Sequence, residues 1–312
     1  MQTQKPVSTP DQRLNLWIFT DNKPGHRNQL QGLVNALSER CVIDGKWIPV
    51  LAQQRGFLGT LNKLRRQYKK RAPDLILGAG HSTHKFLLLS RWLFGGKAVL
   101  LMKPSLPISW FDLVLIPEHD GHFPQTNVIA TRGVINKIKP MPAKNEGKGL
   151  FLIGGPSKHY AWDSRHVAGQ VTAILTAHPD IDWQLTTSRR TPGDFIACLP
   201  GDSQNLSIIP HTACDADWLP KQLSEAGQVW VSEDSVSMIY EALTSGALTG
   251  LLEVPATTSG RVQKGVLNLL QDKLLFRYSD WLLHPKLSLH PAQLNEADRC
   301  AELILKDFCN DE

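Results

Sequence analysis

Short apolar runs alternate with stretches of helical periodicity along the first half of the chain. Runs of mostly apolar residues predict strands, while hydrophobic residues spaced three and four apart predict helices. The predicted strands are residues 14–19, 47–50, 75–78, 98–102, 113–116 and 127–130. The predicted helices are residues 28–39, 58–71 and 83–94.

A second series of predicted strands occupies residues 149–153, 183–187, 206–209, 229–231 and 249–254. Apolar strands that alternate with helices form parallel sheets covered on both faces, so we expect two Rossmann-like, doubly wound α/β domains. A length of 312 residues agrees with two cores. Residues 137–148 carry Pro, Lys and Gly without periodicity, which predicts domains at 1–140 and 141–312. The last predicted helix, 291–307, could pack on either domain.

Residues 228–255 are the most informative stretch. A predicted strand ends at the polar turn Ser232, Glu233, Asp234, Ser235, after which apolar residues recur at helical spacing. A helix N-terminus offers free backbone N–H groups, and the hydroxyls of Ser235 and Ser237 add to them, so a phosphate is favoured there. Glu241 would project beside that anion and could bind a ribose hydroxyl. The alternative is a capping residue followed by an ordinary amphipathic helix.

Composition places the chain among folded globular proteins, with 42% hydrophobic and 20% charged residues. The net charge of +5 fits an anionic substrate or membrane surface but is too small to indicate nucleic acid. No run of about 18 apolar residues occurs and the polar N-terminus lacks a signal-peptide core, so we expect a cytoplasmic protein. The five scattered cysteines form no CxxC pair, which predicts reduced, mostly buried thiols and no zinc site.

Two polar loops follow predicted strands of the N-terminal domain, at the sheet edge where ligands bind in such folds. The first contains Asp21, Lys23, Gly25 and His26. His26 could take a proton from a hydroxyl; Asp21 could serve as the base instead, or orient the histidine. The alternative is a structural histidine. The second loop contains Gly80, His81 and Ser82, which could bind phosphate or acceptor, or merely begin a helix.

Two further loops follow strands of the C-terminal domain. Gly154 and Gly155 would let a ligand approach the backbone, while Ser157 and Lys158 supply a hydroxyl and a positive charge. Arginines 189 and 190 occupy the next loop and suit a pyrophosphate, although a solvated basic turn is an equal alternative.

Five segments together resemble one family: TDNKPGHRNQ, ILGAGHSTH, PSLPISWFDLVLIPEHD, IGGPSKHYAWD and VSEDSVSMIYEALTSG. They are similar to the ELM1 family, known from plant mitochondrial-fission proteins and bacterial homologues, which resembles glycosyltransferases of GT-B architecture. The resemblance implies two Rossmann-like domains facing a cleft, the N-terminal one for the acceptor and the C-terminal one for a nucleotide-sugar donor. It implies a donor side formed by Gly154, Gly155, Ser157, Lys158, Arg189, Glu233, Asp234, Ser235, Ser237, Met238 and Glu241. It implies a catalytic His26 or Asp21 on the acceptor side, near Lys23, Gly25, Gly80, His81 and Ser82.

The sequence thus predicts a glycosyltransferase that acts on a cell-envelope glycolipid or polysaccharide, with no metal or other cofactor. Two alternatives stay open: a non-catalytic interaction scaffold, and a nucleotide-sugar epimerase.

A basic segment raises the question of membrane contact. Its cations are Lys63, Arg65, Arg66, Lys69, Lys70 and Arg71. On a helix they would lie beside an apolar stripe that includes Phe57, Leu61, Leu64 and Tyr68. This segment could rest on the anionic inner face of the cytoplasmic membrane, or be an ordinary surface helix packed on the sheet.

Overall fold

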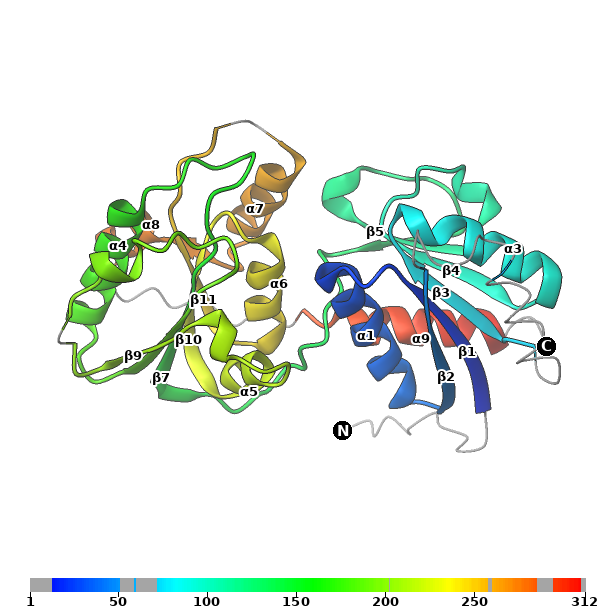
Figure 1. Cartoon of the computed structure of the whole chain (residues 1–312), viewed down its shortest axis with the longest axis horizontal. Coiled ribbons are helices and arrows are strands. Elements are labelled where there is room, and N and C mark those ends of the chain that lie inside the picture. The colour runs from blue at the N-terminus through cyan, green and yellow to red at the C-terminus, as the bar shows by residue number, and fades with distance from the viewer. Residues whose placement is uncertain are drawn as a thin grey trace, which may run out of the picture. The chain divides into compact units, whose positions relative to one another are not determined.

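The computed structural model describes residues 13–50, 59, 72–201, 203–257, 260–284 and 294–309. The chain forms two compact units (Figure 1). The N-terminal unit comprises Met1–Lys137 and Glu296–Glu312, and the C-terminal unit comprises Ile138–Asn295. Each is built on a six-stranded parallel sheet with helices on both faces, which confirms the predicted pair of Rossmann-like, doubly wound domains.

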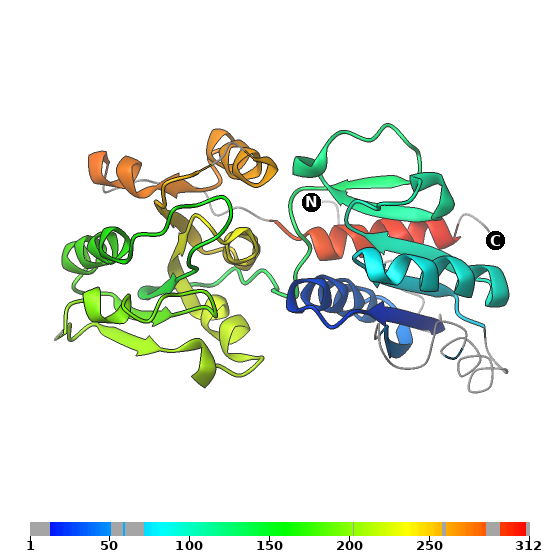
Figure 2. The ribbon, with the colours of Figure 1, turned by 45° about the horizontal axis from the view of Figure 1, so that its top comes forward.

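The sheet of the N-terminal unit has the strand order β2-β1-β3-β4-β5-β6. Its strands are β1 (Arg13–Thr20), β2 (Val42–Pro49), β3 (Leu75–Ala79), β4 (Lys97–Leu101), β5 (Leu113–Pro117) and β6 (Val128–Thr131). Its helices are α1 (Pro24–Ser38), α3 (His84–Phe94) and α9 (Glu296–Cys309), with short 3₁₀ turns η1 (His81–Thr83), η2 (Ile108–Trp110) and η3 (Glu118–Asp120). Helices α1 and α9 pack together on one face and α3 covers the other (Figure 2).

The sheet of the C-terminal unit has the order β12-β11-β10-β7-β8-β9. Its strands are β7 (Asn145–Leu152), β8 (Asp182–Thr186), β9 (Leu206–Ile209), β10 (Ala226–Ser232), β11 (Leu248–Leu252) and β12 (Phe276–Arg277). Its helices are α4 (Ser164–Ala177), α5 (Trp218–Glu225), α6 (Val236–Ser245), α7 (Arg261–Gln271) and α8 (Tyr278–Leu283), with 3₁₀ turns η4 (Ile196–Cys198) and η5 (His211–Ala213). Helices α4 and α8 lie on the face opposite α5 and α6 (Figure 1).

Aromatic packing across glycines shapes the core of the C-terminal unit. The Trp183 ring stacks on Phe151, with ring centroids 4.5 Å apart. It also covers Gly149 of the neighbouring strand so closely that a Cβ there would collide with the indole. Trp230 covers Gly250 in the same way, and a Cβ would lie 2.6 Å from its ring. Both glycines are therefore required by packing.

Several boundaries differ from those predicted. Helix α1 begins at Pro24 instead of residue 28, because proline fits the first position of a helix, where no N–H is needed. Strand β7 begins at Asn145, inside the stretch predicted to be a linker. Helix α9 belongs to the N-terminal unit, and the unit boundary falls after Lys137. Helices α4, α5, α7 and α8 were not predicted.

Three other expectations concern a helix, the cysteines and membrane-spanning segments. The predicted helix 58–71 lies, except for Gly59, outside the described residues. Cys41, Cys198, Cys214 and Cys300 are free thiols, but only Cys300 is fully buried, so the expected burial is wrong for the other three. Among the described helices, none combines the length and apolar character needed to cross a membrane.

Substitution of Gly149 by alanine should destabilise the protein by about 1–3 kcal/mol, because the new methyl group overpacks the site under Trp183. Gly169 is the matched control, since it lies on the exposed side of α4, where an added methyl group would meet no described neighbour within 4 Å. There Gly→Ala should stabilise the protein by about 0.5–1 kcal/mol through helix propensity. Urea denaturation checks both signs; equal effects at the two sites would contradict the packing.

Candidate functional site

Each sheet contains one point at which the strand order reverses. In the N-terminal unit this point lies between β1 and β3, because β2 follows on one side of β1 and β4 follows on the other side of β3. In the C-terminal unit the corresponding pair is β7 and β10. The loops that follow such strands diverge and leave space beyond the carboxyl edge, where ligands of doubly wound sheets bind. Candidate residues in both units lie at these two points.

In the N-terminal unit, Asp21 and His26 form a hydrogen-bonded pair. The Asp21 carboxylate follows β1, and His26 lies in the first turn of α1. The His26 Nδ1 atom is 2.9 Å from Oδ1 and 3.1 Å from Oδ2 of Asp21. The Ser82 hydroxyl, from the loop after β3, donates to Asp21 Oδ2 at 3.2 Å. Asp21 therefore joins the two diverging loops.

Local backbone geometry holds this pair in place. Asn22 has φ of 61°, a left-handed conformation that asparagine tolerates better than most residues. The tight turn brings the backbone N–H of Lys23 to Asp21 Oδ1 at 3.2 Å. Gly80, with φ of 84°, lies directly against the His26 ring, and a Cβ there would collide with it. The predicted residue Gly80 thus has a packing role.

The charge of Asp21 determines which ring nitrogen of His26 carries the proton. Burial acts to raise the pKa of Asp21, but hydrogen bonds from His26 and the Lys23 N–H, with the charge of His26 and the Ser82 hydroxyl, lower it below its ordinary value. An ionised carboxylate only accepts hydrogen bonds, so Nδ1 of His26 must donate. In the neutral ring Nε2 then carries the lone pair and can accept a proton.

A second histidine lies close to this loop. His84 begins α3 and is buried, with its ring edge-on to both His81 and Phe111. Burial, together with neighbouring His81, lowers the pKa of His84 to about 4. His84 is therefore neutral at physiological pH, whereas the predicted residues His81 and Ser82 are exposed.

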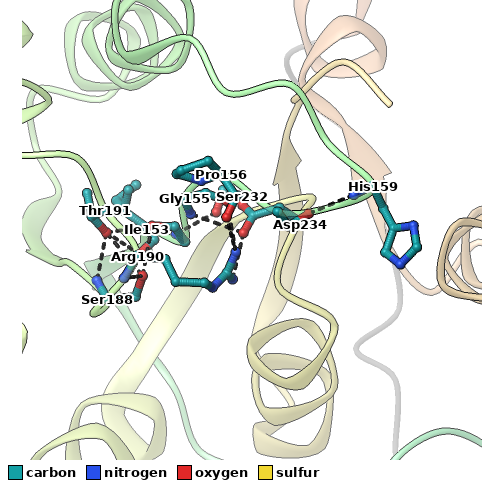
Figure 3. A network of polar contacts seen from close by, with 11 residues as sticks. Ile153, Gly155, Pro156, His159, Ser188, Arg190, Thr191, Ser232 and Asp234 are labelled. Atoms are coloured by element: carbon teal, nitrogen blue, oxygen red, sulfur yellow. Dashed lines mark hydrogen bonds and ion pairs between the residues drawn. The ribbon is translucent and has the colours of Figure 1, made fainter. Parts of the chain in front are cut away.

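In the C-terminal unit, the Gly154–Gly155 turn after β7 is bound by residues of two neighbouring loops (Figure 3). The Gly154 N–H donates to the Ser232 hydroxyl at 2.7 Å, and the Gly155 N–H donates to Asp234 Oδ2 at 3.0 Å. The Ser188 hydroxyl donates to the Gly154 carbonyl at 2.8 Å. The glycines were predicted to let a ligand approach the backbone. At Gly154 the Asp234 side chain takes that place, because a Cβ there would collide with its carboxylate.

Arg190 completes this network (Figure 3). Its guanidinium pairs with Asp234 Oδ2 at 2.7 Å and donates to the carbonyls of Gly155 at 2.8 Å and Pro156 at 3.2 Å. The Asp234 side chain is fully buried, whereas that of Arg190 is 42% exposed. Burial raises the pKa of Asp234, against the hydrogen bonds from Ser232 and Gly155 and the charge of Arg190. Its second oxygen, Oδ1, has no hydrogen-bond partner among the described residues.

The other acid of the predicted polar turn has a different partner. Glu233 accepts a hydrogen bond from Arg277 at 3.0 Å and is buried, which raises its pKa against the attraction of that arginine. Tyr160 is buried nearby; burial and the negative charges of Glu233 and Asp234 raise the pKa of Tyr160 to about 12. Its phenol stays protonated and, within the described residues, its hydroxyl is unpaired.

Helix α6 begins directly after these acids. Ser235 is its N-cap residue, yet its side chain makes no capping hydrogen bond to the described residues of the first turn. Ser237 is exposed, Met238 is half-buried, and Glu241 is buried within the helix. The hydrogen bond that the capping alternative requires of Ser235 is therefore not made to the described residues. The phosphate and ribose roles stay predictions.

The structure brings some predicted residues together and leaves others apart. Gly154, Gly155, Asp234 and the start of α6 meet at one switch point, while Asp21, His26, Gly80 and Ser82 meet at the other. Lys23 belongs to the second group, because its N–H donates to Asp21 and its exposed Nζ is 3.4 Å from Asp21 Oδ2. Gly25, Ser157, Lys158 and Arg189 are exposed. In the described parts of the chain, no three His, Cys, Asp or Glu side chains group as metal ligands.

Both arginines of this loop were named from the sequence, but only Arg189 was assigned to the donor side, whereas Arg190 is the one that pairs with Asp234. Neither Ser188 nor Arg277 was given a role. The two arginines are adjacent in an irregular loop, where no periodicity indicates which one points inward. Arg277 ends the short strand β12, which the sequence pattern did not predict. Recognition of that strand would have placed Arg277 at the carboxyl edge of the sheet.

Comparisons with known proteins agree with this architecture. A model of the family described as "Mitochondrial fission ELM1" matches residues 24–308. Protein RP120 of Rickettsia prowazekii (strain Madrid E), described as uncharacterized, is 23% identical over 93% of this chain and 98% of its own length. The resemblance predicted from the motifs is therefore confirmed.

Two solved structures show the same fold at low identity. The UDP-GlcNAc 2-epimerase of Neisseria meningitidis, bound to UDP-GlcNAc, is 9% identical, with a TM-score of 0.55 over 96% of this chain and 100% of that one. The glycotransferase of kitacinnamycin is 13% identical, with a TM-score of 0.51 over 95% of this chain and 99% of that one. The likeness to both shows a GT-B-like fold.

Replacement of Arg190 by glutamine should destabilise the protein by about 1–3 kcal/mol, because it removes the positive charge that pairs with the buried Asp234 carboxylate. The adjacent, exposed Arg189 is the matched control, and its glutamine variant should stay within about 0.5 kcal/mol of the parent. Because protonation of Asp234 removes the negative charge that Arg190 balances, the stability lost in the Arg190 variant should shrink as pH falls. Denaturation at several pH values measures it; equal stability of the two variants would contradict the assignment.

Proposed function

The chain belongs to the mitochondrial fission ELM1 family, and we propose that it is a GT-B-type glycosyltransferase. It moves a sugar from a nucleotide-sugar donor to a cell-envelope glycolipid or polysaccharide. The N-terminal unit binds the acceptor and the C-terminal unit binds the donor. Nucleotide-sugar chemistry is supported by the similar fold of an enzyme bound to UDP-GlcNAc, which makes UDP-GlcNAc the first donor to test.

The observation that carries this proposal is the Asp21–His26 pair. Asp21 holds Nδ1 of His26 in its protonated form, so Nε2 can remove the proton of an acceptor hydroxyl as it attacks the sugar. Asp21 also stabilises the imidazolium that forms. Both transfer and epimerisation need a base, since epimerisation removes a proton from C2 of the sugar. The pair therefore favours an enzyme over the scaffold alternative, and the requirement for an acceptor hydroxyl is what separates transfer from epimerisation.

On the donor side, Arg190 replaces Arg189 in the role first predicted. Its exposed part and the N–H groups at the start of α6, with the hydroxyls of Ser235 and Ser237, stabilise the diphosphate that leaves. Glu241 hydrogen-bonds the ribose. The Gly155 N–H already donates to Asp234, so it is not available to the phosphate. The Asp234 carboxylate instead positions the glycine turn and Arg190. The reaction then needs no metal ion.

A nucleoside diphosphate should stabilise the protein by about 2.7 kcal/mol when present at roughly 100 times its dissociation constant. Glu241→Gln, which keeps the size of this buried side chain, should weaken UDP about tenfold or more and leave pyrophosphate unchanged. Thermal-shift titrations with both ligands provide the measurement. Equal loss for the two would remove Glu241 from the ribose role, and no stabilisation by any nucleotide would favour the scaffold alternative.

Replacement of His26 by alanine should lower turnover by on the order of 10²–10⁴ without changing UDP affinity, because the donor residues belong to the other unit. Asp21→Asn should also lower turnover, since an amide cannot hold the histidine in the same tautomer. His122, exposed in the same unit, is the control and should tolerate alanine.

Release of UDP from UDP-GlcNAc in the presence of a lipid or polysaccharide extract reports this turnover. Unchanged release by the His26 variant would exclude it as the base. Proton NMR of UDP-GlcNAc without acceptor distinguishes the epimerase, because inversion of the sugar at C2 then occurs with no second substrate.

A further inference from the structure

Exposed apolar side chains of the N-terminal unit gather on one surface. Of the four large hydrophobic side chains that are exposed among its described residues, three lie on α3 and η2: Trp92 at 78%, Leu93 at 48% and Trp110 at 51%. Single exposed hydrophobic residues are ordinary, but a group that includes two indoles marks an interaction surface.

Helical spacing explains how this surface forms. Residues 85, 88, 89 and 92 lie on one stripe of α3, because residues three and four apart share a helix face. Leu88 and Leu89, with Leu106 and Trp110 from the segment opposite, line an open groove of about 660 Å³. Trp92 continues the same stripe beyond the groove. The result is an apolar track along the outer side of α3.

The charges beside the track are positive. Among the described residues that line the groove, Lys85 and Arg91 are charged and none is acidic. Arg91 pairs with Asp112 at 2.6 Å and donates to the Trp110 carbonyl at 3.2 Å, which fixes η2 against α3 while its side chain stays 43% exposed. Because Asp112 neutralises Arg91, the surface presents two exposed indoles and the cation Lys85.

We propose that this surface of α3 and η2 rests on an anionic lipid bilayer. Indole rings prefer the membrane interface, where the ring contacts acyl chains and the N–H reaches the headgroups. Lysine beside such rings adds attraction to anionic headgroups. The groove between Leu88 and Leu106 accepts part of an acyl chain, which a flat polar surface would not. Lys63–Arg71, the segment first predicted to touch the membrane, is not needed for this contact.

The same surface leads to the candidate catalytic residues. Lys85 lies three residues after Ser82, whose hydroxyl binds Asp21, and the seven-residue step from Lys85 to Trp92 spans about 10 Å of helix. A lipid whose tail follows the track would place its polar head toward Ser82 and His26. The membrane contact does not depend on the proposed glycosyltransferase activity. Only the idea that this contact delivers a lipid-linked acceptor rests on that proposed function.

Sedimentation of the full chain with vesicles tests the contact. The protein should bind vesicles that contain phosphatidylglycerol, bind pure phosphatidylcholine more weakly, and be released by salt. Replacement of Trp92 and Trp110 by serine should weaken binding about tenfold for each indole. Lys85→Gln should weaken it about fivefold. All these side chains are exposed, so the melting temperature should be unchanged.

Leu282→Ser with Leu283→Ser is the matched control, because these leucines are 54% and 75% exposed on α8 of the other unit. This variant should bind vesicles like the parent. Binding by the tryptophan variant equal to that of the parent would overturn the proposal, as would tryptophan-dependent self-association without lipid, which would assign the surface to a second copy. Stabilisation by UDP is measured in parallel, so loss of the nucleotide site and loss of the membrane contact are distinguished.

Discussion

The reversal of strand order within each parallel sheet is the constraint on which the rest of this structure depends. Crossover connections leave the sheet on opposite sides at that point, so the loops after β1 and β3, and after β7 and β10, diverge. In both units a buried aspartate carboxylate then links the diverging loops. Asp21 accepts from Ser82 across one gap, and Asp234 accepts from the Gly155 N–H across the other.

The two aspartates have opposite electrostatic situations, and this difference separates their roles. For Asp21, hydrogen bonds outweigh burial and the pKa falls, so a stable carboxylate orients His26. For Asp234, burial dominates and the pKa rises, so the carboxylate depends on Arg190 and the Gly155 N–H for its charge. The first arrangement suits catalysis by the neighbouring histidine. The second holds a glycine turn and an arginine in fixed positions beside the start of α6.

The strands could be predicted from the sequence because strands buried on both faces of a parallel sheet are nearly continuous apolar runs, as at 75–79 and 113–117. The edges of elements could not, because Pro24 is compatible with either a turn or a first helical position. The grouping of Asp21, His26 and Ser82 was partly foreseen, since loops at one sheet edge meet. The choice between Arg189 and Arg190 was not, because it depends on the backbone path of an irregular loop and on the buried Asp234 that it pairs with.

Hydrogen–deuterium exchange of the full chain, with and without UDP-GlcNAc, tests most directly whether the switch point of the C-terminal unit is a donor site. Binding there should slow exchange in segments 154–159 and 233–241, because the ligand covers the turn after β7 and the start of α6. Helix α4, on the far face of the same sheet, should change little. Slower exchange confined to the amino edge of the sheet, or no change at a saturating ligand concentration, would contradict the assignment.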